Sequence, residues 1–94
     1  MNLYDEIYKL VKKIPPGQVT TYGVIAKKLG TSPRVVGNAL HRNPDPVNIP
    51  CHRVVDRNGK LAKGYAFRGW KEQKRKLLLE GVRFKDENHV KLSN

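Results

Sequence analysis

Apolar side chains at the start of the chain recur every three or four positions, the spacing of one face of a helix. The repeating residues are Leu3, Ile7, Leu10 and Val11, with Tyr4 and Tyr8 one step around the same face. The pattern predicts a helix over residues 3–13, which the run Pro15-Pro16-Gly17 ends. Residues 19–21 are then expected to form a short extended stretch.

Two shorter helices are expected next. Thr20 or Thr21 can cap the first, and Gly30 ends it. Its apolar face comprises Val24, Ile25 and Leu29. Ser32 before Pro33 is typical of a second cap, so a further helix is predicted over residues 33–41. Two short helices joined by a tight turn with glycine are the outline of a helix-turn-helix, although plain helical hairpins share that outline.

The second half of the chain alternates turns with short elements. Asn58-Gly59 favours a hairpin turn between residues 52–55 and 60–62, and a hairpin placed after a helix-turn-helix is a wing. A last helix is predicted over residues 70–80 with Leu77 and Leu78 turned inward, then a short strand over 82–84 and a loose tail over 85–94. The expected fold is therefore one mostly helical domain over residues 1–94 with a small β wing, a winged helix-turn-helix.

The net charge of +11 points to a polyanionic partner, most commonly DNA or RNA. An anionic membrane surface or an acidic protein stays possible at this point. One cysteine cannot form an internal disulfide, no apolar run is long enough to span a bilayer, and the start of the chain does not resemble a signal peptide. We therefore expect a cytoplasmic protein without a membrane segment, and no metal site, because ligand-spaced clusters are absent from the sequence.

The sequence Pro50-Cys51-His52 places the one cysteine of the chain directly before a histidine. A thiol beside an imidazole is a candidate nucleophile, because only the thiolate attacks and a neighbouring base raises its population. The alternative is a buried structural cysteine, which behaves as a small hydrophobic residue.

Residues 49–55, Ile-Pro-Cys-His-Arg-Val-Val, resemble the active-site signature of the O6-alkylguanine-DNA alkyltransferase family. Other segments similar to the family, in the same order along the chain, are Thr21-Tyr22-Gly23, residues 32–37, Asn43-Pro44, Gly64-Tyr65 and Glu80-Gly81. The resemblance extends from about residue 3 to residue 82.

This resemblance implies a protein that binds double-stranded DNA containing O6-alkylguanine from the minor groove. It flips the damaged base and takes the alkyl group irreversibly onto Cys51, as a nucleoid-associated monomer that needs no cofactor. His52 resembles the general base that acts through a bridging water, and Glu80 the carboxylate that orients it. Asn43 resembles the asparagine that braces the active-site loop. Tyr65 resembles the tyrosine that donates a proton or a hydrogen bond to guanine O6.

The resemblance also implies a DNA-binding set: Thr21, Tyr22, Arg34, Gly37, Leu40 and Arg53. Tyr22 would press on the target phosphate, and Arg34 would fill the stack that the flipped base leaves. For Leu40 a plain core position is an equal alternative, and Arg53 could instead brace the active-site loop. The remaining phosphate contacts are expected among Lys27, Lys28, Arg42, Arg57, Lys60 and Lys63.

Several features depart from the family pattern. The additional N-terminal domain that the family usually carries is missing, Ala66-Phe67-Arg68 replaces a small residue with paired glycines, and the stretch 74–80 is one residue shorter than in many alkyltransferases. A second hypothesis is therefore a damage sensor, similar to alkyltransferase-like proteins, that binds O6-alkylguanine and recruits other repair. Those proteins carry tryptophan or alanine in place of the cysteine. A third hypothesis, a winged-helix transcription regulator, is disfavoured because no dimerisation element is evident.

Overall fold

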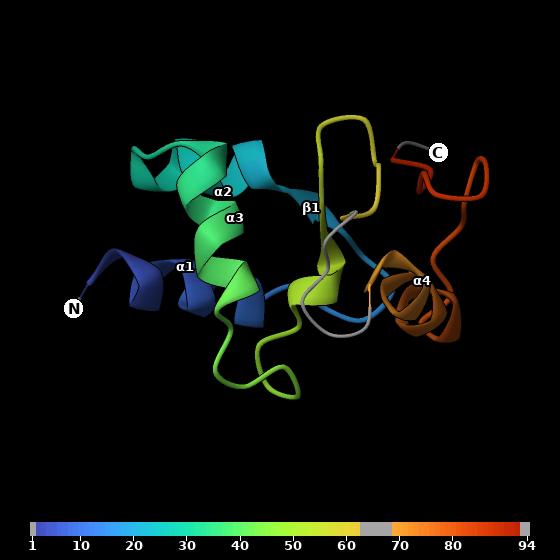
Figure 1. The fold of residues 1–94 in the computed structure, drawn as a ribbon, viewed down its shortest axis with the longest axis horizontal. Coiled ribbons are helices and arrows are strands. Elements are labelled where there is room, and N and C mark those ends of the chain that lie inside the picture. Colours follow the sequence, from blue (N-terminus) through green and yellow to red (C-terminus); the bar gives the residue numbers. More distant parts are fainter. Residues whose placement is uncertain (1, 63–68, 93–94) are drawn as a thin grey trace.

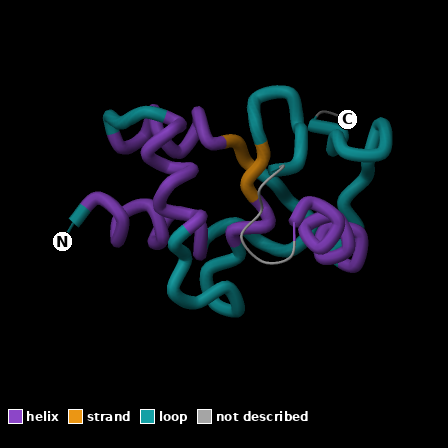
Figure 2. Tube along the Cα trace, in the orientation of Figure 1, coloured by secondary structure: helices purple, strands orange, loops and turns teal. Residues whose placement is uncertain are grey.

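The chain folds into four α-helices and a small two-stranded sheet over the part that the computed structural model describes, residues 2–62 and 69–92. The elements are α1 (Leu3–Lys12), β1 (Thr20–Thr21), α2 (Tyr22–Leu29), α3 (Pro33–His41), the 3₁₀ turn η1 (Cys51–Arg53), β2 (Val54–Val55) and α4 (Gly69–Leu79). Figures 1 and 2 show α1, α2 and α3 gathered at one end and α4 at the other. The predicted mostly helical fold with few strands is confirmed.

Local capping explains why the first three helices begin where they do. The side chains of Asn2, Thr21 and Ser32 each accept a hydrogen bond from the backbone N–H three residues further on. Gly30 ends α2 in the left-handed conformation, with φ of 67°. These signals lie within a few residues of each boundary, so the sequence predicted all three helices to within one residue at each end.

The sheet is not the predicted hairpin. β2 pairs in parallel with β1, with Thr20 opposite Val54. His52 and Arg53, predicted as the start of a strand, belong instead to η1. The turn at Asn58-Gly59 does form, because the N–H of Asp56 donates to the carbonyl of Lys60 at 3.2 Å. Beyond that turn Lys60 pairs with His89 and not with β2. The predicted pairing of the two wing strands with each other is therefore wrong.

Residues 85–92 pack against the rest of the molecule instead of forming a loose tail. The N–H of Val90 donates to the carbonyl of Gly59 at 2.8 Å, and the Val90 side chain is fully buried. A Cβ on Gly59 would lie 2.6 Å from the Val90 carbonyl oxygen, so this close approach requires glycine. The predicted loose tail is therefore wrong for residues 85–92, because an apolar side chain and backbone hydrogen bonds attach them to the turn.

Two hydrophobic clusters meet at β2. One joins α1, α2 and α3 and includes Val54, and the other joins α4 to the C-terminal segment and includes Val55. Successive side chains of a strand point to opposite faces, so β2 contributes one valine to each cluster. The turn η1 precedes β2 directly and thus lies between the two halves of the molecule (Figure 1).

Two apolar residues predicted to face inward are exposed. Val24 on α2 is 46% exposed and Leu78 on α4 is 53% exposed. In each helix a neighbouring residue occupies the inner face instead, Ile25 in α2 and Leu77 in α4. Adjacent helical residues lie about 100° apart, and the buried face of α2 runs through Ile25 and Ala26, which turns Val24 towards solvent.

Candidate functional site

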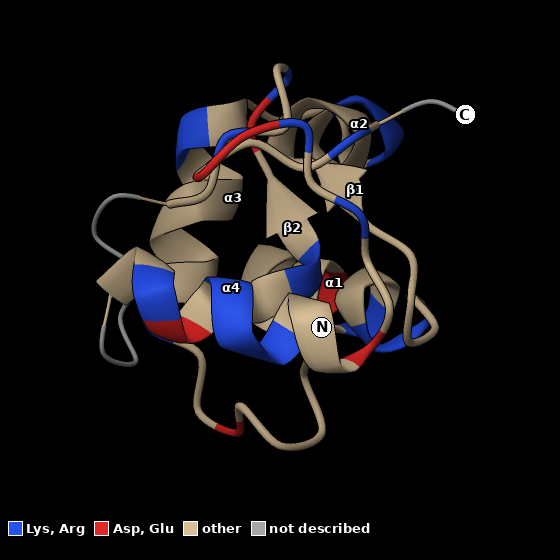
Figure 3. Ribbon diagram, turned by 90° about the vertical axis from the view of Figure 1, so that its right-hand side faces the viewer, with Lys and Arg blue, Asp and Glu red and all other residues tan. Residues whose placement is uncertain are grey.

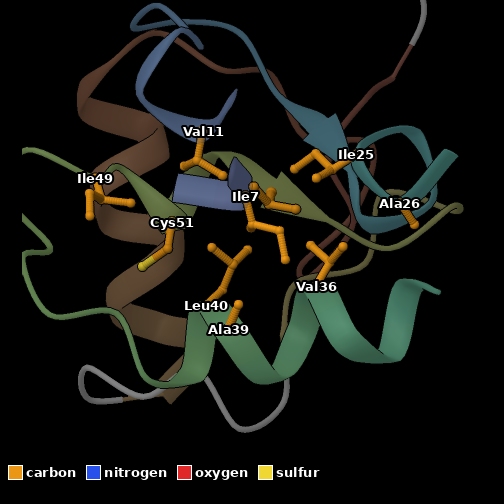
Figure 4. Close-up of a cluster of buried hydrophobic side chains, with 10 residues drawn as sticks. Ile7, Val11, Ile25, Ala26, Val36, Ala39, Leu40, Ile49 and Cys51 are labelled. Carbon is orange, nitrogen blue, oxygen red and sulfur yellow. The ribbon is translucent and has the colours of Figure 1, made fainter. Parts of the chain in front are cut away.

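Cys51 is the first residue of η1 and lies at the margin of the cluster built by α1, α2 and α3. Its side chain is 5% exposed, and its N–H donates to the carbonyl of Ile49 at 2.7 Å. Figure 4 shows Cys51 on the Ile49 side of the cluster, away from Val36 and Ala26. The structure therefore buries the predicted nucleophile, and the residues beside it decide whether it is a reactive thiol or a packing residue.

His52, Arg53 and Glu80 form a connected group next to Cys51. The ring Nε2 of His52 lies 2.9 Å from Oε2 of Glu80. Arg53 donates to both carboxylate oxygens of Glu80, through Nε at 3.0 Å and through a terminal nitrogen at 2.6 Å. Its other terminal nitrogen donates to the carbonyl of Ile14 at 2.7 Å. The structure thus brings together His52 and Glu80, as predicted, across 28 positions of the sequence.

Arg53 differs from its predicted place. Its side chain is 13% exposed and its guanidinium is directed at Glu80 and Ile14 rather than at the surface. A bidentate arginine–carboxylate pair fixes both partners in orientation. The prediction of Arg53 as a DNA contact is therefore replaced by the bracing alternative, because its donors are committed to interior acceptors.

The electrostatics of this group favour an ionised Glu80 beside a neutral His52. Burial alone would raise the pKa of Glu80, but the hydrogen bonds and charges of Arg53 and His52 outweigh it and hold that pKa at about 2. Burial lowers the pKa of His52 below its ordinary value of 6.5, although the hydrogen bond and the charge of Glu80 act to raise it. At neutral pH an acceptor-only carboxylate faces Nε2, so the neutral ring carries its proton on Nε2 and keeps Nδ1 as a base.

Nδ1 of His52 is the one buried side-chain nitrogen or oxygen, among the described residues, that makes no hydrogen bond. Buried polar groups in native proteins are nearly always partnered, so each exception calls for a reason. An unprotonated ring nitrogen reserved for proton transfer is such a reason.

Asn43 is buried and joins the two ends of the loop that leads to Cys51. Its Nδ2 donates to the carbonyl of Ile49 at 2.8 Å, and its Oδ1 accepts from the N–H of Asp45 at 2.9 Å. The loop between α3 and η1 is therefore closed by one side chain. This placement agrees with the bracing role that the resemblance implies, and the role itself remains a prediction.

The predicted DNA-binding residues lie on α2 and α3. Thr21 is the N-cap of α2 and Tyr22 its first residue. Burial, and then the charge of Cys51, raise the pKa of Tyr22, so the phenol lies within electrostatic range of the thiol. Arg34 is exposed in the first turn of α3, whereas Leu40 is 6% exposed and belongs to the hydrophobic cluster. Leu40 therefore occupies a core position, and its contact with the flipped base stays a prediction.

Gly37 is half-buried in the middle of α3, and a Cβ there would meet no atom within 4 Å. The fold itself does not require glycine at this position. Tyr65 and the departing residues Ala66, Phe67 and Arg68 lie outside the described residues.

Sequence reasoning missed Gln73, a fully buried polar residue on α4 that is hydrogen-bonded to the active-site turn. The available signal was its spacing. Gln73 stands four residues before Leu77 and seven before Glu80, on the face of α4 that the apolar pattern turns inward. A glutamine at an inward position needs partners, and the sequence does not say which.

In the described ranges, 2–62 and 69–92, no three His, Cys, Asp or Glu side chains are grouped so that they could hold a metal ion. Within the same ranges none of the helices has the length and apolar character that a membrane span needs.

The fold and the site together define a class of protein: a small helical domain with a Cys-His pair backed by a carboxylate. Residues 2–82 match the family model of the 6-O-methylguanine DNA methyltransferase, DNA binding domain. The chain belongs to this family.

Curated relatives support this membership. The chain is 50% identical over 74 residues to a methylated-DNA–protein-cysteine methyltransferase of Thermococcus kodakarensis, which covers 79% of this chain and 41% of the relative. It is 53% identical over 77 residues to the protein of the same name from Saccharolobus solfataricus, covering 82% of this chain and 49% of the relative. The chain thus spans about half the length of the curated relatives that it matches.

Solved structures show the same fold. S. pombe Atl1 in complex with damaged DNA containing O6-carboxymethylguanine has a TM-score of 0.81 and 33% identity, and the match covers 99% of this chain and 93% of that chain. The O6-methylguanine-DNA methyltransferase of Pyrococcus kodakaraensis has a TM-score of 0.74 and 43% identity, covering 87% of this chain and 47% of that chain.

Proposed function

We propose that this protein repairs DNA by moving the alkyl group of an O6-alkylguanine onto Cys51, once per protein molecule. The observation that carries this proposal is the arrangement beside Cys51. His52 is held through Nε2 by an ionised Glu80, which leaves Nδ1 as a base, and Arg53 fixes the carboxylate. A sensor that only binds the lesion has no use for a nucleophile with an oriented base.

The transfer is a displacement at carbon. His52 accepts the thiol proton of Cys51 through a bridging water, and the thiolate attacks the methyl or methylene carbon. The S–C bond forms as the C–O6 bond breaks, and its electron pair leaves with O6. A proton delivered to the guanine, for which Tyr65 is the proposed donor, then restores a neutral base. No cofactor enters the balance, and the thioether that forms does not turn over.

The DNA is proposed to bind as a duplex along α2 and α3, which act as a helix-turn-helix with the turn at residues 56–60 as the wing. Arg34, exposed in the first turn of α3, is placed to enter the stack that the flipped guanine leaves. Gly37 supports close approach of α3 to the minor groove, because no atom of the fold explains its missing side chain. Thr21 and Tyr22 would contact the target phosphate from the start of α2. We propose that one domain, acting as a cytoplasmic monomer, suffices.

The second candidate function is a non-catalytic sensor that binds O6-alkylguanine and recruits other repair. The observation that favours it is the structural similarity to Atl1, with a TM-score of 0.81 against 0.74 for the Pyrococcus kodakaraensis methyltransferase.

An assay of the DNA separates the two functions. A duplex with one O6-methylguanine is titrated with protein from a molar deficit to a molar excess, and the lesion remaining in the DNA is counted. The repair function predicts that the lesion is converted to guanine, one lesion per protein molecule. It further predicts that Cys51→Ser binds the duplex with unchanged affinity and converts none. Lesion-selective binding without conversion by the wild type would favour the sensor.

A further inference from the structure

Gln73 connects α4 to the active-site turn through its side-chain amide. Nε2 donates to the carbonyl of His52 at 3.1 Å and to that of Val54 at 3.2 Å, while Oε1 accepts from the N–H of Ala62 at 2.9 Å. The side chain is fully buried. Two acceptors on one side and a donor on the other leave only one assignment of the amide nitrogen and oxygen.

Gln73 and Glu80 both hydrogen-bond to His52. Glu80 directly follows the last residue of α4, and its N–H still donates to the carbonyls of Lys76 and Leu77. Seven residues are two helical turns, so the backbone positions of Gln73 and Glu80 lie about 10 Å apart along the axis, with the buried Leu77 between them. Glu80 contacts the ring of His52 at Nε2, and Gln73 contacts the backbone of His52 at its carbonyl. His52 is therefore attached to α4 at two points.

The backbone contact matters because η1 is a single 3₁₀ turn. The last carbonyls of so short a turn have no partner within the turn and must find one elsewhere. Gln73 supplies that partner to the carbonyl of His52, and it also donates to the carbonyl of Val54, the first residue of β2. The carbonyl contact holds the backbone of His52 where Nε2 of its ring reaches Glu80. Without that contact the turn is free to shift and to draw Nε2 away from the carboxylate that fixes the tautomer.

We propose that Gln73 is a positioning residue for alkyl transfer, which holds the backbone of His52 so that the ring keeps its orientation relative to Cys51. This inference rests on the proposed function. General bases act only within hydrogen-bond reach of the proton that they take, and a misplacement of about 1 Å can cost on the order of 100-fold in rate.

Two substitutions test this role. Gln73→Met has nearly the same shape and removes all three hydrogen bonds. Gln73→Glu keeps an acceptor for the N–H of Ala62 and loses the donors to His52 and Val54. We expect the single-turnover rate of methyl transfer to fall about 10- to 100-fold in both, with duplex affinity within about twofold of the wild type. The measurements are made at a temperature where far-UV circular dichroism shows each variant folded.

Val90→Ala is the matched control for lost stability. Val90 is fully buried in the cluster that α4 shares with the C-terminal segment, and its side chain makes no hydrogen bond to η1. This variant loses packing but keeps the amide of Gln73, so its transfer rate should stay within about twofold of the wild type.

Nitrogen-15 NMR of the His52 ring gives a readout that a purely structural role would not move. In DNA-free wild type and in Val90→Ala we expect one tautomer, protonated at Nε2. In Gln73→Met and Gln73→Glu we expect a mixture of tautomers. Wild-type rates together with a single tautomer in both Gln73 variants would overturn the proposal.

The NMR comparison does not depend on alkyl transfer, so the two proposals fail separately. If the wild type transfers no methyl group but the tautomer changes in the Gln73 variants, the repair function is wrong and the positioning of His52 stands. If the wild type transfers and the Gln73 variants match it in rate and tautomer, the repair function stands and the role of Gln73 is wrong.

Discussion

At the scale of single residues, the carboxylate of Glu80 connects His52 to Arg53. It receives hydrogen bonds from His52 and from two nitrogens of Arg53 while only 17% of its side chain is exposed. Two donors, one of them a permanent cation, stabilise the ionised form far more than burial destabilises it. Glu80 therefore contributes to folding as well as to the orientation of His52.

The pKa of Glu80 predicts how stability depends on pH. That pKa is about 2 in the folded protein against an ordinary value of 4.5. A carboxylate with a lowered pKa stabilises the folded state fully above about pH 4.5, and this contribution is lost as the pH falls from 4.5 towards 2. By linkage it amounts to roughly 3 kcal/mol at pH 7, so urea unfolding should show Glu80→Gln destabilised by that amount at pH 7 and by progressively less below pH 4.5.

Glu72→Gln is the control for this measurement. Glu72 pairs with Arg75 on the outside of α4, where an ion pair contributes up to about 1 kcal/mol. A destabilisation of Glu80→Gln that was no larger than that of Glu72→Gln, or that did not change between pH 7 and pH 3, would contradict the account of Glu80.

The sequence located most of this site but not its internal contacts. Cys51 and His52 are adjacent, so a local motif identified both, and Glu80 followed from the family pattern even though the stretch before it is a residue shorter. The direction of Arg53 and the partners of Gln73 depend on contacts across 27 and 21 positions of the chain. Such contacts exist only once α4 has packed on η1, and for that reason no local pattern showed them.

At the scale of elements, the helices were predictable and the sheet was not. Caps and glycine ends act over three or four residues, which the sequence displays directly. The partner of a strand is decided by distant segments competing for the same backbone groups. Here β2 pairs with β1, and Lys60 from the second strand of the expected hairpin pairs with His89 of the C-terminal segment.

Helix α3 gives a prediction in which stability and binding move in opposite directions. Glycine inside a helix costs roughly 0.5–1 kcal/mol relative to alanine, and a Cβ at Gly37 would meet nothing in the fold. Gly37→Ala should therefore stabilise the protein by about that amount in thermal or urea unfolding. Because α3 is proposed to enter the minor groove, the same variant should bind the lesion duplex more weakly, about 10-fold or more.

Gly23→Ala provides the comparison. Gly23 is a second helical glycine, exposed on α2, where a Cβ would meet only the Thr21 hydroxyl at 3.9 Å. Weaker DNA binding that was equal in the two variants, or unchanged binding by Gly37→Ala, would count against α3 as the element in the groove.

At the scale of the whole molecule, the positive charges are spread over several elements, whereas the reactive group lies at one place, η1. Figure 3 shows lysines and arginines on α2, on α4 and on the segments between them, so the positive residues are spread over several elements. Such a distribution attracts DNA from many directions but does not define where it binds. Under the proposed function, the position of the lesion is set instead by Cys51 in η1, at the junction of the two hydrophobic clusters.

The central claim is that the sulfur of Cys51 receives the alkyl group. Intact mass measurement of the protein after incubation with a duplex carrying O6-methylguanine, followed by peptide mapping, tests it most directly. The account predicts one methyl group in place of the thiol hydrogen on nearly every protein molecule. It further predicts that the group maps to Cys51 and does not appear in Cys51→Ser. An unchanged mass for a protein that binds the lesion duplex tightly, or a methyl group on another residue, would contradict it.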